Sequence, residues 1–109
     1  MRKTGCIFCD IIQGEKPATI VYESDRVLIF KDIFPRAPIH LLVIPKKHIR
    51  SLNDLTTDDQ ETVAAMIFSC QAIAAQLGFA RAGYRIFFNV ESGGGQDIFH
   101  LHLHLMAGW

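Results

Sequence analysis

The sequence predicts an α+β fold with a five-stranded antiparallel sheet, one long helix and a short N-terminal helix. Several short runs of β-branched and aromatic residues, separated by turn residues, have the character of strands. A single longer run repeats its apolar residues every three or four positions, which is typical of an amphipathic helix. The strand-like runs follow one another as hairpins and show no regular βαβ alternation. This order favours an antiparallel sheet with a helix laid across one face.

Length and charge restrict the classes of protein to which the chain can belong. With 109 residues, half of them hydrophobic, it has enough apolar side chains for one core, and we expect a single domain over 1–109. Lys plus Arg and Asp plus Glu number eleven each, so the formal net charge is zero. A protein that binds a nucleic-acid backbone usually carries a basic surplus, so we expect no nucleic-acid partner. A site for one or two phosphates needs only local donors and stays open.

The cytoplasm is the expected location of the protein. No apolar run has the length of a membrane span, so no membrane association is expected. The apolar stretch that begins at Cys6 is broken at Asp10, which makes it too short for the core of a signal peptide. The chain has three cysteines, and an odd number argues against a secreted disulfide scaffold.

The first half of the chain contains the short helix and three of the strands. The helix is expected over 9–13, where Gly14 ends it. The first two strands flank the turn Ser24–Asp25 as a hairpin, and a loop with two prolines, 33–38, follows them. The third strand stops at Pro45, because proline cannot donate a hydrogen bond within a sheet. The expected strands are 20–23, 27–30 and 40–44.

The long helix follows a segment, 51–55, that is irregular or forms one helical turn. Thr57 and Gln60 have the spacing of a capping box at its start, and Gly78 ends it. The apolar positions that share one face of this helix are Val63, Met66, Ile67, Cys70, Ile73, Ala74 and Leu77. The remaining elements are two strands with a flexible glycine turn between them: 84–90, 92–95 and 98–106.

Three histidines alternate with leucines in the last expected strand. Successive side chains of a strand point to opposite faces, so His100, His102 and His104 share one face, roughly 6–7 Å apart. The leucines between them share the other face, where they can pack against the long helix. The strand is therefore expected to be held rigidly by its leucines while it presents a row of imidazoles.

From the residues alone, three interpretations of this histidine row stay open. It is a polar, solvent-facing strand, or a zinc site completed by a further ligand, or a catalytic site in which a neutral imidazole attacks phosphorus. The glycines at 93–95 precede the row, and their backbone N–H groups can approach an anion without obstruction by side chains. A phosphate cradle beside a possible nucleophile favours the catalytic interpretation.

Two segments have a more specific pattern. His100–Met106 reads His-x-His-x-His followed by two apolar residues, and 32–48 reads Asp-Ile-Phe-Pro-Arg-Ala-Pro-Ile-His-Leu-Leu-Val-Ile-Pro-Lys-Lys-His. Together they resemble the histidine triad (HIT) family, in particular its Hint branch of nucleoside phosphoramidate hydrolases, and among these the bacterial zinc-binding type. The resemblance extends from about Cys6 to Trp109 and implies a HIT-like fold.

The resemblance implies an enzyme that hydrolyses purine nucleoside 5′-phosphoramidates or acyl-adenylates through a nucleotidyl-histidine intermediate. The family's middle histidine is the nucleophile, which is His102 in this chain. His104 and His40 would contact the α-phosphate or the leaving group, and His100 completes the expected catalytic set. A dinucleoside polyphosphate hydrolase and a non-catalytic nucleotide-binding regulator are the alternatives. The resemblance also implies a homodimer whose sheets join edge to edge, and no organic cofactor.

The resemblance further implies a binding site for a purine nucleotide such as AMP. Asp32 would hydrogen-bond to the ribose hydroxyls. The residues expected to surround the base, phosphate and leaving group are Phe8, Ile11, Phe30, Ile33, Asn89, Gly95 and Gln96. Without the family, the apolar members are ordinary core residues, Asn89 is a turn residue and Asp32 a loop carboxylate.

Asp97 is a departure from the family, because many relatives have a hydroxyl residue at this position. An acid that pointed into the site would repel phosphate. We therefore expect the Asp97 side chain to face away from the site and only its backbone N–H to contribute to binding.

Cys6 and Cys9 form a C-x-x-C pair, a spacing that is also found in redox-active cysteine pairs. A structural zinc site needs four ligands, of which two cysteines supply half. Some bacterial relatives with this pair complete a zinc site with histidines at the positions of His48 and His100. The resemblance therefore implies Zn²⁺ held by all four side chains, the alternative being two free, partly buried thiols. If zinc binds, His100 belongs to the metal, and catalysis rests on His102 and His104.

Overall fold

The computed structural model describes residues 3–109, and these form one five-stranded antiparallel sheet with two helices. The strands are β1 (Ile20–Glu23), β2 (Val27–Lys31), β3 (Ile39–Pro45), β4 (Tyr84–Phe88) and β5 (Leu103–Ala107). They lie in the order β1-β2-β3-β5-β4, and every neighbouring pair is antiparallel. The predicted α+β class and strand number are confirmed.

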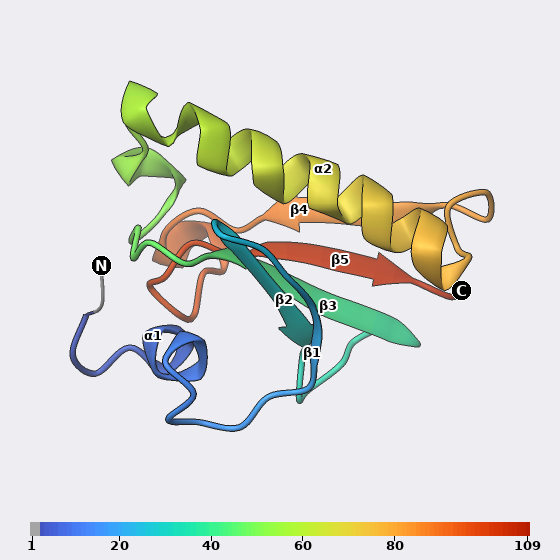
Figure 1. Cartoon of the computed structure of the whole chain (residues 1–109), viewed down its shortest axis with the longest axis horizontal. Coiled ribbons are helices and arrows are strands. Elements are labelled where there is room, and N and C mark those ends of the chain that lie inside the picture. Colours follow the sequence, from blue (N-terminus) through green and yellow to red (C-terminus); the bar gives the residue numbers. More distant parts are fainter. Residues whose placement is uncertain (1–2) are drawn as a thin grey trace.

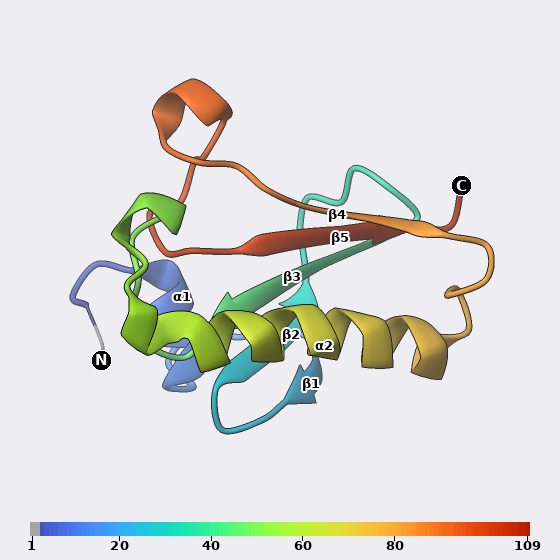
Figure 2. The same ribbon diagram turned by 90° about the horizontal axis from the view of Figure 1, so that it is seen from above.

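The two helices lie on opposite faces of the sheet (Figures 1 and 2). The long helix, α2 (Gln60–Leu77), crosses one face, and the short helix, α1 (Ile7–Ile12), packs against the other. Three short 3-10 helices lie in the connections: η1 (Leu52–Asp54), η2 (Thr57–Asp59) and η3 (Ser92–Gly94). Within the described residues, neither helix combines the length and apolar character that a membrane span requires.

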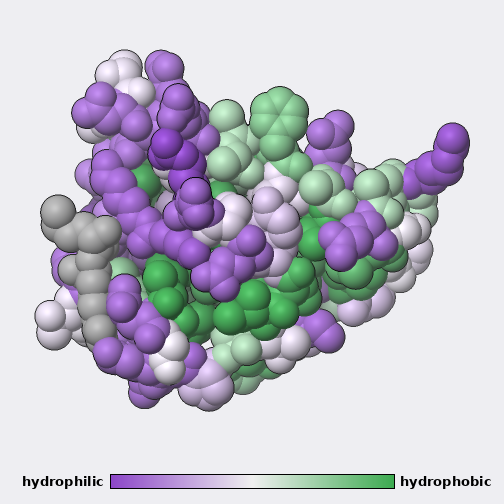
Figure 3. Space-filling model, viewed as in Figure 1, coloured by the Kyte–Doolittle hydropathy of each residue, from purple (hydrophilic) through white to green (hydrophobic). Residues whose placement is uncertain are grey.

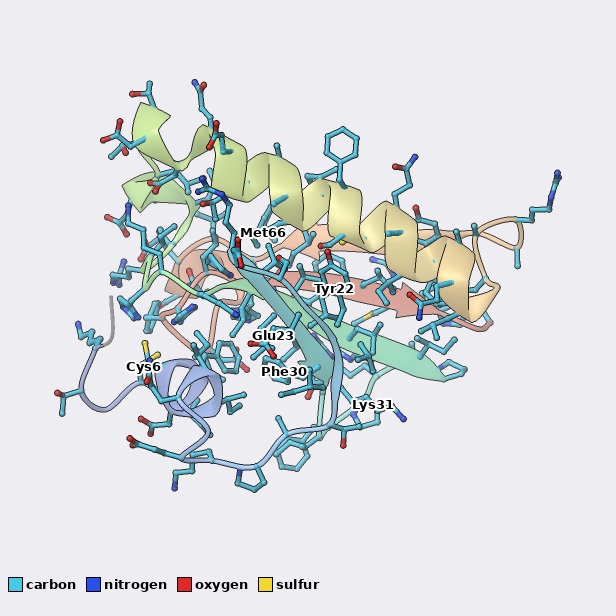
Figure 4. All side chains as sticks on the ribbon, viewed as in Figure 1. Cys6, Tyr22, Glu23, Phe30, Lys31 and Met66 are labelled. Carbon is cyan, nitrogen blue, oxygen red and sulfur yellow. The ribbon has the colours of Figure 1, made fainter. Side chains whose placement is uncertain are left out.

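The core has two parts, one on each face of the sheet. Successive residues of β2 point alternately to the two faces, so Ile29 packs with α2 and Phe30 packs with α1. Figure 4 shows Phe30 on the side of α1 and Met66 of α2 turned toward the sheet. Because both faces are covered, β2 reads as a nearly continuous apolar run rather than an alternating one. The surface is mixed, and apolar side chains are exposed across the middle of the face in Figure 3.

The last strand begins later than the sequence predicts. β5 starts at Leu103 rather than at 98, because its pairing with β3 ends at the pair Val43–Leu103. Before that point, the Leu101 N–H donates to the Ile49 carbonyl (2.6 Å) instead of to a strand. The predicted alternation nevertheless continues through this segment. The leucines at 101, 103 and 105 are buried in the core beneath α2. The histidines between them have different neighbours: His100 contacts Cys6, His102 contacts Phe8 and His104 contacts His40.

The start of α2 also differs from the prediction. The capping box is formed by Thr56 and Asp59 rather than by Thr57 and Gln60. The Asp59 carboxylate accepts from the Thr56 N–H (2.9 Å) and ends the 3-10 turn η2, from which α2 continues. The C-terminal prediction is confirmed, because Gly78 ends α2 in the left-handed conformation that glycine adopts without strain.

Other boundaries shift by a few residues. α1 starts at Ile7 rather than Cys9, because the Cys6 side chain caps it by accepting from the Cys9 N–H. β4 ends at Phe88 rather than at Val90. The predicted flexible glycine turn is the ordered 3-10 helix η3.

Candidate active site

A cavity of about 660 Å³ lies beside α1, β2 and the histidine segment, which is a size that suits a small organic ligand. It is also bounded by the loop after β2 and by the segment around η3. The lining residues that the sequence analysis assigned to the site are Phe8, Ile11, Phe30, Asp32, Ile33, Asn89, Gly95, Asp97, His102 and His104. The structure thus brings residues from four distant segments to one cavity.

The apolar end of the cavity is formed by α1 and β2. The rings of Phe8 and Phe30 meet edge to face with their centroids 5.5 Å apart, and both residues are buried together with Ile11. These three residues are core residues that also line the cavity. In contrast, Ile33 and Phe34 lie in the loop after β2, more than three-quarters exposed, at the mouth of the cavity. A flat apolar ligand group has room between the buried wall and this rim.

A backbone hydrogen bond determines the neutral tautomer of His102, which lines the cavity. Its Nδ1 lies 2.8 Å from the His100 carbonyl oxygen, and because a carbonyl only accepts, Nδ1 carries the hydrogen. In the neutral ring, the lone pair is then on Nε2. The Phe8 ring stands edge to face against the imidazole with a centroid distance of 5.3 Å. These two contacts fix the orientation of the ring and leave Nε2 as its nitrogen without a hydrogen in the neutral form.

His40 and His104 form a second hydrogen-bonded pair. The Arg36 backbone N–H donates to His40 Nδ1 (3.1 Å), so a neutral His40 carries its hydrogen on Nε2. That nitrogen donates to His104 Nδ1 (2.9 Å), which leaves the His104 hydrogen on Nε2. Among the described residues, His104 Nε2 is the buried side-chain polar atom without a hydrogen-bond partner. An unsatisfied buried donor is costly, and a ligand acceptor in the cavity would satisfy it.

Both histidines of this pair favour the neutral form. Burial, together with the neighbouring His102 and His40, lowers the pKa of His104 to about 4. Burial also lowers the pKa of His40, although the Asp32 carboxylate, whose Oδ2 lies 3.4 Å from His40 Nε2, acts in the opposite direction. In the ligand-free protein, a neutral His104 offers a hydrogen-bond donor through its tautomer.

The segment after β4 is closed by a pair of interactions between Glu91 and Gln96. The Gln96 amide oxygen accepts from the Glu91 N–H (2.8 Å), and its amide nitrogen donates to the Arg50 and Ile98 carbonyls. The Gln96 N–H in turn donates to the Glu91 carbonyl (3.0 Å). Gln96 is therefore buried beneath the segment and does not line the cavity, whereas Gly95 and Asn89 do.

The expected orientation of Asp97 is wrong. Its side chain lines the cavity, and its Oδ1 lies 3.8 Å from Nε2 of His102. The closure of the segment at Gln96 directs the next residue toward the histidines rather than away from them. The carboxylate is 83% exposed, so solvent offsets the repulsion on which the expectation was based.

A second cluster joins Cys6, Cys9, His48 and His100, whose ligand atoms all lie within 4.8 Å of one another. Figure 4 shows Cys6 at the N-terminal end of α1. His100 Nδ1 lies 3.3 Å from Cys6 Sγ and 3.1 Å from His48 Nδ1, and Cys9 Sγ lies 3.4 Å from His48 Nδ1. The structure thus places His100 in this cluster and not among the residues that line the cavity.

The chemistry of this cluster fits a zinc ion. His100 Nε2 donates to the Pro45 carbonyl (2.9 Å), so the lone pair of Nδ1 faces the thiols. Burial lowers the pKa of His100 to about 4 and also lowers the pKa of His48, so both imidazoles stay neutral. Two sulfurs and two neutral imidazoles form a tetrahedral zinc set, and a carbonyl on the far ring nitrogen is the usual supporting contact.

Sequence reasoning missed three groups that support the histidines. The Arg36 backbone N–H and the Pro45 carbonyl set two of the tautomers, and backbone groups leave no residue-type signal. Phe87 stacks on His104 with ring centroids 4.7 Å apart and an interplanar angle of 11°. Phe87 and His104 are directly paired across β4 and β5, so a correct register of the two strands would have identified this contact.

Comparison with known proteins gives matches over nearly the whole chain. A family model described as "Scavenger mRNA decapping enzyme C-term binding" matches residues 5–108. The purine nucleoside phosphoramidase of Escherichia coli K12 is 42% identical over 102 residues, which cover 94% of this chain and 86% of that protein.

Two crystal structures are similar in both sequence and fold. A HIT family hydrolase from Legionella pneumophila is 50% identical with a TM-score of 0.94, and the match covers 96% of this chain and 94% of that one. A histidine triad protein from Clostridium difficile is 46% identical with a TM-score of 0.97, and the match covers 100% of this chain and 95% of that one.

Proposed function

Because this chain belongs to the histidine triad (HIT) family, we propose that it is a hydrolase that cleaves purine nucleoside 5′-phosphoramidates or acyl-adenylates at the α-phosphorus. The observation that supports this proposal best is the tautomer of His102, whose Nε2 lone pair faces the cavity. The similarity to a purine nucleoside phosphoramidase supports the class of substrate.

In the first half of the reaction, His102 Nε2 attacks the α-phosphorus. A bond forms between Nε2 and phosphorus, and the bond between phosphorus and the leaving group breaks. For a phosphoramidate, the leaving nitrogen takes up a proton and departs as an amine. The His102 ring becomes positively charged as it bonds to phosphorus, and the His100 carbonyl that accepts from Nδ1–H stabilises this charge.

In the second half, water cleaves the nucleotidyl-histidine. The water oxygen bonds to phosphorus, the bond from phosphorus to Nε2 breaks, and the water gives up one proton to the solvent, which balances the proton taken up by the leaving nitrogen. The products are a nucleoside monophosphate and the neutral His102 ring. Each cycle therefore consumes one water and needs no redox step.

The surrounding residues are assigned by the direction of their polar atoms. The His104 Nε2–H donates to an oxygen of the α-phosphate, and His40 fixes the His104 tautomer. The proton for the leaving nitrogen comes from solvent water, because protonation of His104 at Nδ1 would set two N–H groups against each other between His104 and His40. Asp32 binds the ribose hydroxyls next to this pair, and Gly95 and Asn89 face the phosphate. The base lies between the Phe8–Phe30 wall and Ile33.

We further propose that the cysteine–histidine cluster holds a structural zinc ion. Cys6, Cys9, His48 and His100 would be its ligands, and zinc would supply a cross-link between the N-terminal helix and the histidine segment. The ion takes no part in the reaction at phosphorus. His100 is then a metal ligand, and the reacting histidines are His102 and His104, with His40 behind His104.

The substitution His102→Ala tests the catalytic proposal. The variant should bind AMP with nearly unchanged affinity, since base and ribose contacts remain, but should hydrolyse adenosine 5′-phosphoramidate at least about 1,000-fold more slowly. A rate equal to that of the unchanged protein would contradict the covalent mechanism. Trapping the phosphorus–nitrogen adduct on His102 by an alkaline quench is the direct measurement, because this bond hydrolyses in acid.

The same assay separates the alternatives. Faster turnover of a diadenosine polyphosphate than of the phosphoramidate would identify a dinucleoside polyphosphate hydrolase. AMP binding without turnover of either compound would identify a non-catalytic nucleotide-binding regulator.

We also propose that two copies of the chain form a homodimer through the edges of their sheets. β4 is an edge strand, and its Ile86 is 39% exposed, so a second copy can pair with this edge and cover the apolar side chain. Light scattering should give twice the 12.3 kDa mass of the chain, and Ile86→Lys should shift the protein toward the monomer. A monomer at micromolar concentration would contradict this arrangement.

A further inference from the structure

Asp97 stands at one end of a continuous row of polar side chains that starts at Asp32. Along this row, Asp32 Oδ2 lies 3.4 Å from His40 Nε2, and His40 Nε2 lies 2.9 Å from His104 Nδ1. The rings of His104 and His102 have centroids 5.0 Å apart, and His102 Nε2 lies 3.8 Å from Asp97 Oδ1. Two carboxylates therefore lie at opposite ends of the site, with the reacting histidines between them.

The two ends of this row are not equivalent for a substrate. In the proposed function, on which this inference rests, the ribose lies at Asp32 and the phosphorus lies at His102. The part of the substrate beyond phosphorus then extends toward Asp97. A second cavity of about 310 Å³ shares Ile7, Asp97 and Ile98 with the first one, so the leaving group has space at this end.

Within residues 3–109, the charged groups at the leaving-group end are one acid and one lysine, and only the acid also lines the first cavity. Among the described residues, Asp97 is the acid that lines the second cavity, and it also lines the first. Lys3 lines the second cavity, as does His48, which belongs to the proposed zinc site. The cations of the first cavity are Lys16, Lys31 and Arg36, which line it together with the ribose-side acid Asp32. Asp97 thus places a negative charge 3.8 Å from His102 Nε2, the atom that attacks phosphorus in the proposed function.

We propose that Asp97 selects leaving groups by charge and favours amines that carry an additional positive group. A substrate of this class has an ammonium group a few bonds from the scissile nitrogen, as in a phosphoramidate of a diamine or of a basic amino acid side chain. The Asp97 carboxylate attracts this ammonium and repels a carboxylate or phosphate in the same place. The reaction itself is unchanged: the phosphorus–nitrogen bond breaks, the scissile nitrogen leaves with one added proton, and the distal ammonium keeps its protons.

The same charge disfavours dinucleoside polyphosphates. Their leaving group is a second nucleotide with several negative charges, and it would lie beside the carboxylate. Asp97 therefore acts as a specificity-determining residue that separates phosphoramidate substrates from polyphosphate substrates within the proposed reaction class.

Three adenosine 5′-phosphoramidates of equal chain length test the proposal. Their amine chains end in a methyl, an ammonium or a carboxylate group, and kcat/KM is measured for each at low salt. For the unchanged protein, we expect the ammonium compound to exceed the carboxylate compound about 3- to 10-fold, because each exposed charge pair has a small effect and the two effects multiply. In Asp97→Asn, this ratio should fall to about 1, and Asp97→Glu should retain most of it.

Asp25→Asn is the matched control. It removes the same charge from an exposed position in the turn between β1 and β2, outside both cavities, and should leave the ratio unchanged. The charge selection would be overturned if the ammonium and carboxylate compounds had equal kcat/KM in the unchanged protein, or if Asp97→Asn did not alter their ratio. In either case, turnover of the methyl compound would still support the proposed function. A ratio below 1 that Lys3→Gln raises would assign the selection to Lys3 and overturn it as well. No turnover of any of the three compounds would refute the proposed function and with it this inference.

Discussion

Single hydrogen bonds give three chemically identical histidines three different roles. A carbonyl oxygen only accepts, so the ring nitrogen that faces it must carry the hydrogen, and the opposite nitrogen keeps its lone pair. By this rule His102 offers a lone pair to the cavity and His100 offers one to the thiols. His104 offers an N–H instead, because its Nδ1 accepts from His40. The backbone partner of each ring, and not the residue type, determines what the ring can do.

The Arg36 backbone N–H should therefore affect catalysis without touching the substrate. Arg36→Pro removes this donor, so neutral His40 is free to exchange tautomers, and the hydrogen bond to His104 is lost in part of the molecules. We expect turnover of adenosine phosphoramidate to fall about fivefold, since one such hydrogen bond contributes roughly 1 kcal/mol. Nitrogen-15 chemical shifts of the His40 ring report the tautomer directly.

Arg36→Ala is the control for this experiment, because it removes the side chain and keeps the N–H. It should leave the His40 nitrogen shifts unchanged, so that any loss of turnover common to both variants is assigned to the guanidinium group. An Arg36→Pro protein with the original His40 tautomer would refute the assignment.

The buried imidazole of His104 should make stability depend on pH. The pKa of His104 is lowered to about 4 in the folded protein, against about 6.5 in an unfolded chain. Between these values the unfolded chain binds a proton that the folded protein does not. Stability is therefore complete above pH 6.5 and decreases as the pH falls toward 4, by up to about 3 kcal/mol from this residue. Urea unfolding at pH 7.5 and 4.5 should show a smaller decrease for His104→Gln, and equal decreases would contradict the prediction.

At this scale the sequence predicted which residues meet but not how their polar atoms are directed. The alternation of histidine and leucine was sufficient to place the leucines at 101, 103 and 105 beneath α2. The direction of the Asp97 side chain was predicted wrongly, because it depends on the Glu91–Gln96 interaction five residues apart. No periodicity in the sequence indicates that the amide of Gln96 is used inside its own loop.

Among the elements, the segment 91–97 determines the shape of the phosphate side of the cavity. Glu91 has a positive φ of 61°, which is uncommon for a residue with a side chain, so the surrounding contacts must hold it there. Its carboxylate accepts from Arg50 and from the Ser51 hydroxyl, and its N–H donates to Gln96. The strained residue is thus fixed from both its backbone and its side chain.

Gln96 should be essential to this segment although it does not line the cavity. Gln96→Ala leaves the Glu91 N–H and the Arg50 and Ile98 carbonyls without their partner, so we expect a loss of about 1–3 kcal/mol in the free energy of unfolding. Gln96→Glu should be at least as harmful, because it keeps an acceptor for Glu91 but turns a carboxylate oxygen toward two carbonyls. Urea unfolding measures both variants, and a Gln96→Glu protein as stable as the original would refute this role.

The sequence predicted the existence of the elements better than their limits. Gly78 marked the end of α2 correctly, because a left-handed residue is a local requirement. The capping box was placed one residue too late, since Thr56 and Thr57 are both suitable caps and only the tertiary position of Asp59 selects between them. The start of β5 depends on where β3 still has residues that can pair with it, and the pairing ends at Val43 and Leu103. The sequence of β5 alone does not contain this information.

In the molecule as a whole, the cysteine–histidine cluster connects the two ends of the chain. α1 supplies Cys9, its N-terminal cap is Cys6, and the segment before β5 supplies His100. Helix α1 has only six residues, which is too short to be stable alone, so its position depends on the contacts it makes. Phe8 of the same helix lines the nucleotide cavity and contacts the His102 ring. The position of this wall is thus linked to the cluster.

Removal of the metal should consequently weaken both stability and activity. We expect about one zinc per chain in the purified protein, and its removal by a chelator should lower the free energy of unfolding by several kcal/mol, because binding to the folded state alone adds to stability. Turnover should fall as well, since His100 would bind the proposed zinc through Nδ1 while its carbonyl accepts from His102. Cys6→Ser should reproduce both effects without a chelator.

Cys70→Ala is the matched control, because this thiol is buried in the core beneath α2, outside the cluster, and its loss should leave the zinc content unchanged. A protein that contains no metal as purified, or that unfolds at the same urea concentration before and after chelation, would show that the four side chains hold α1 in place through their own contacts.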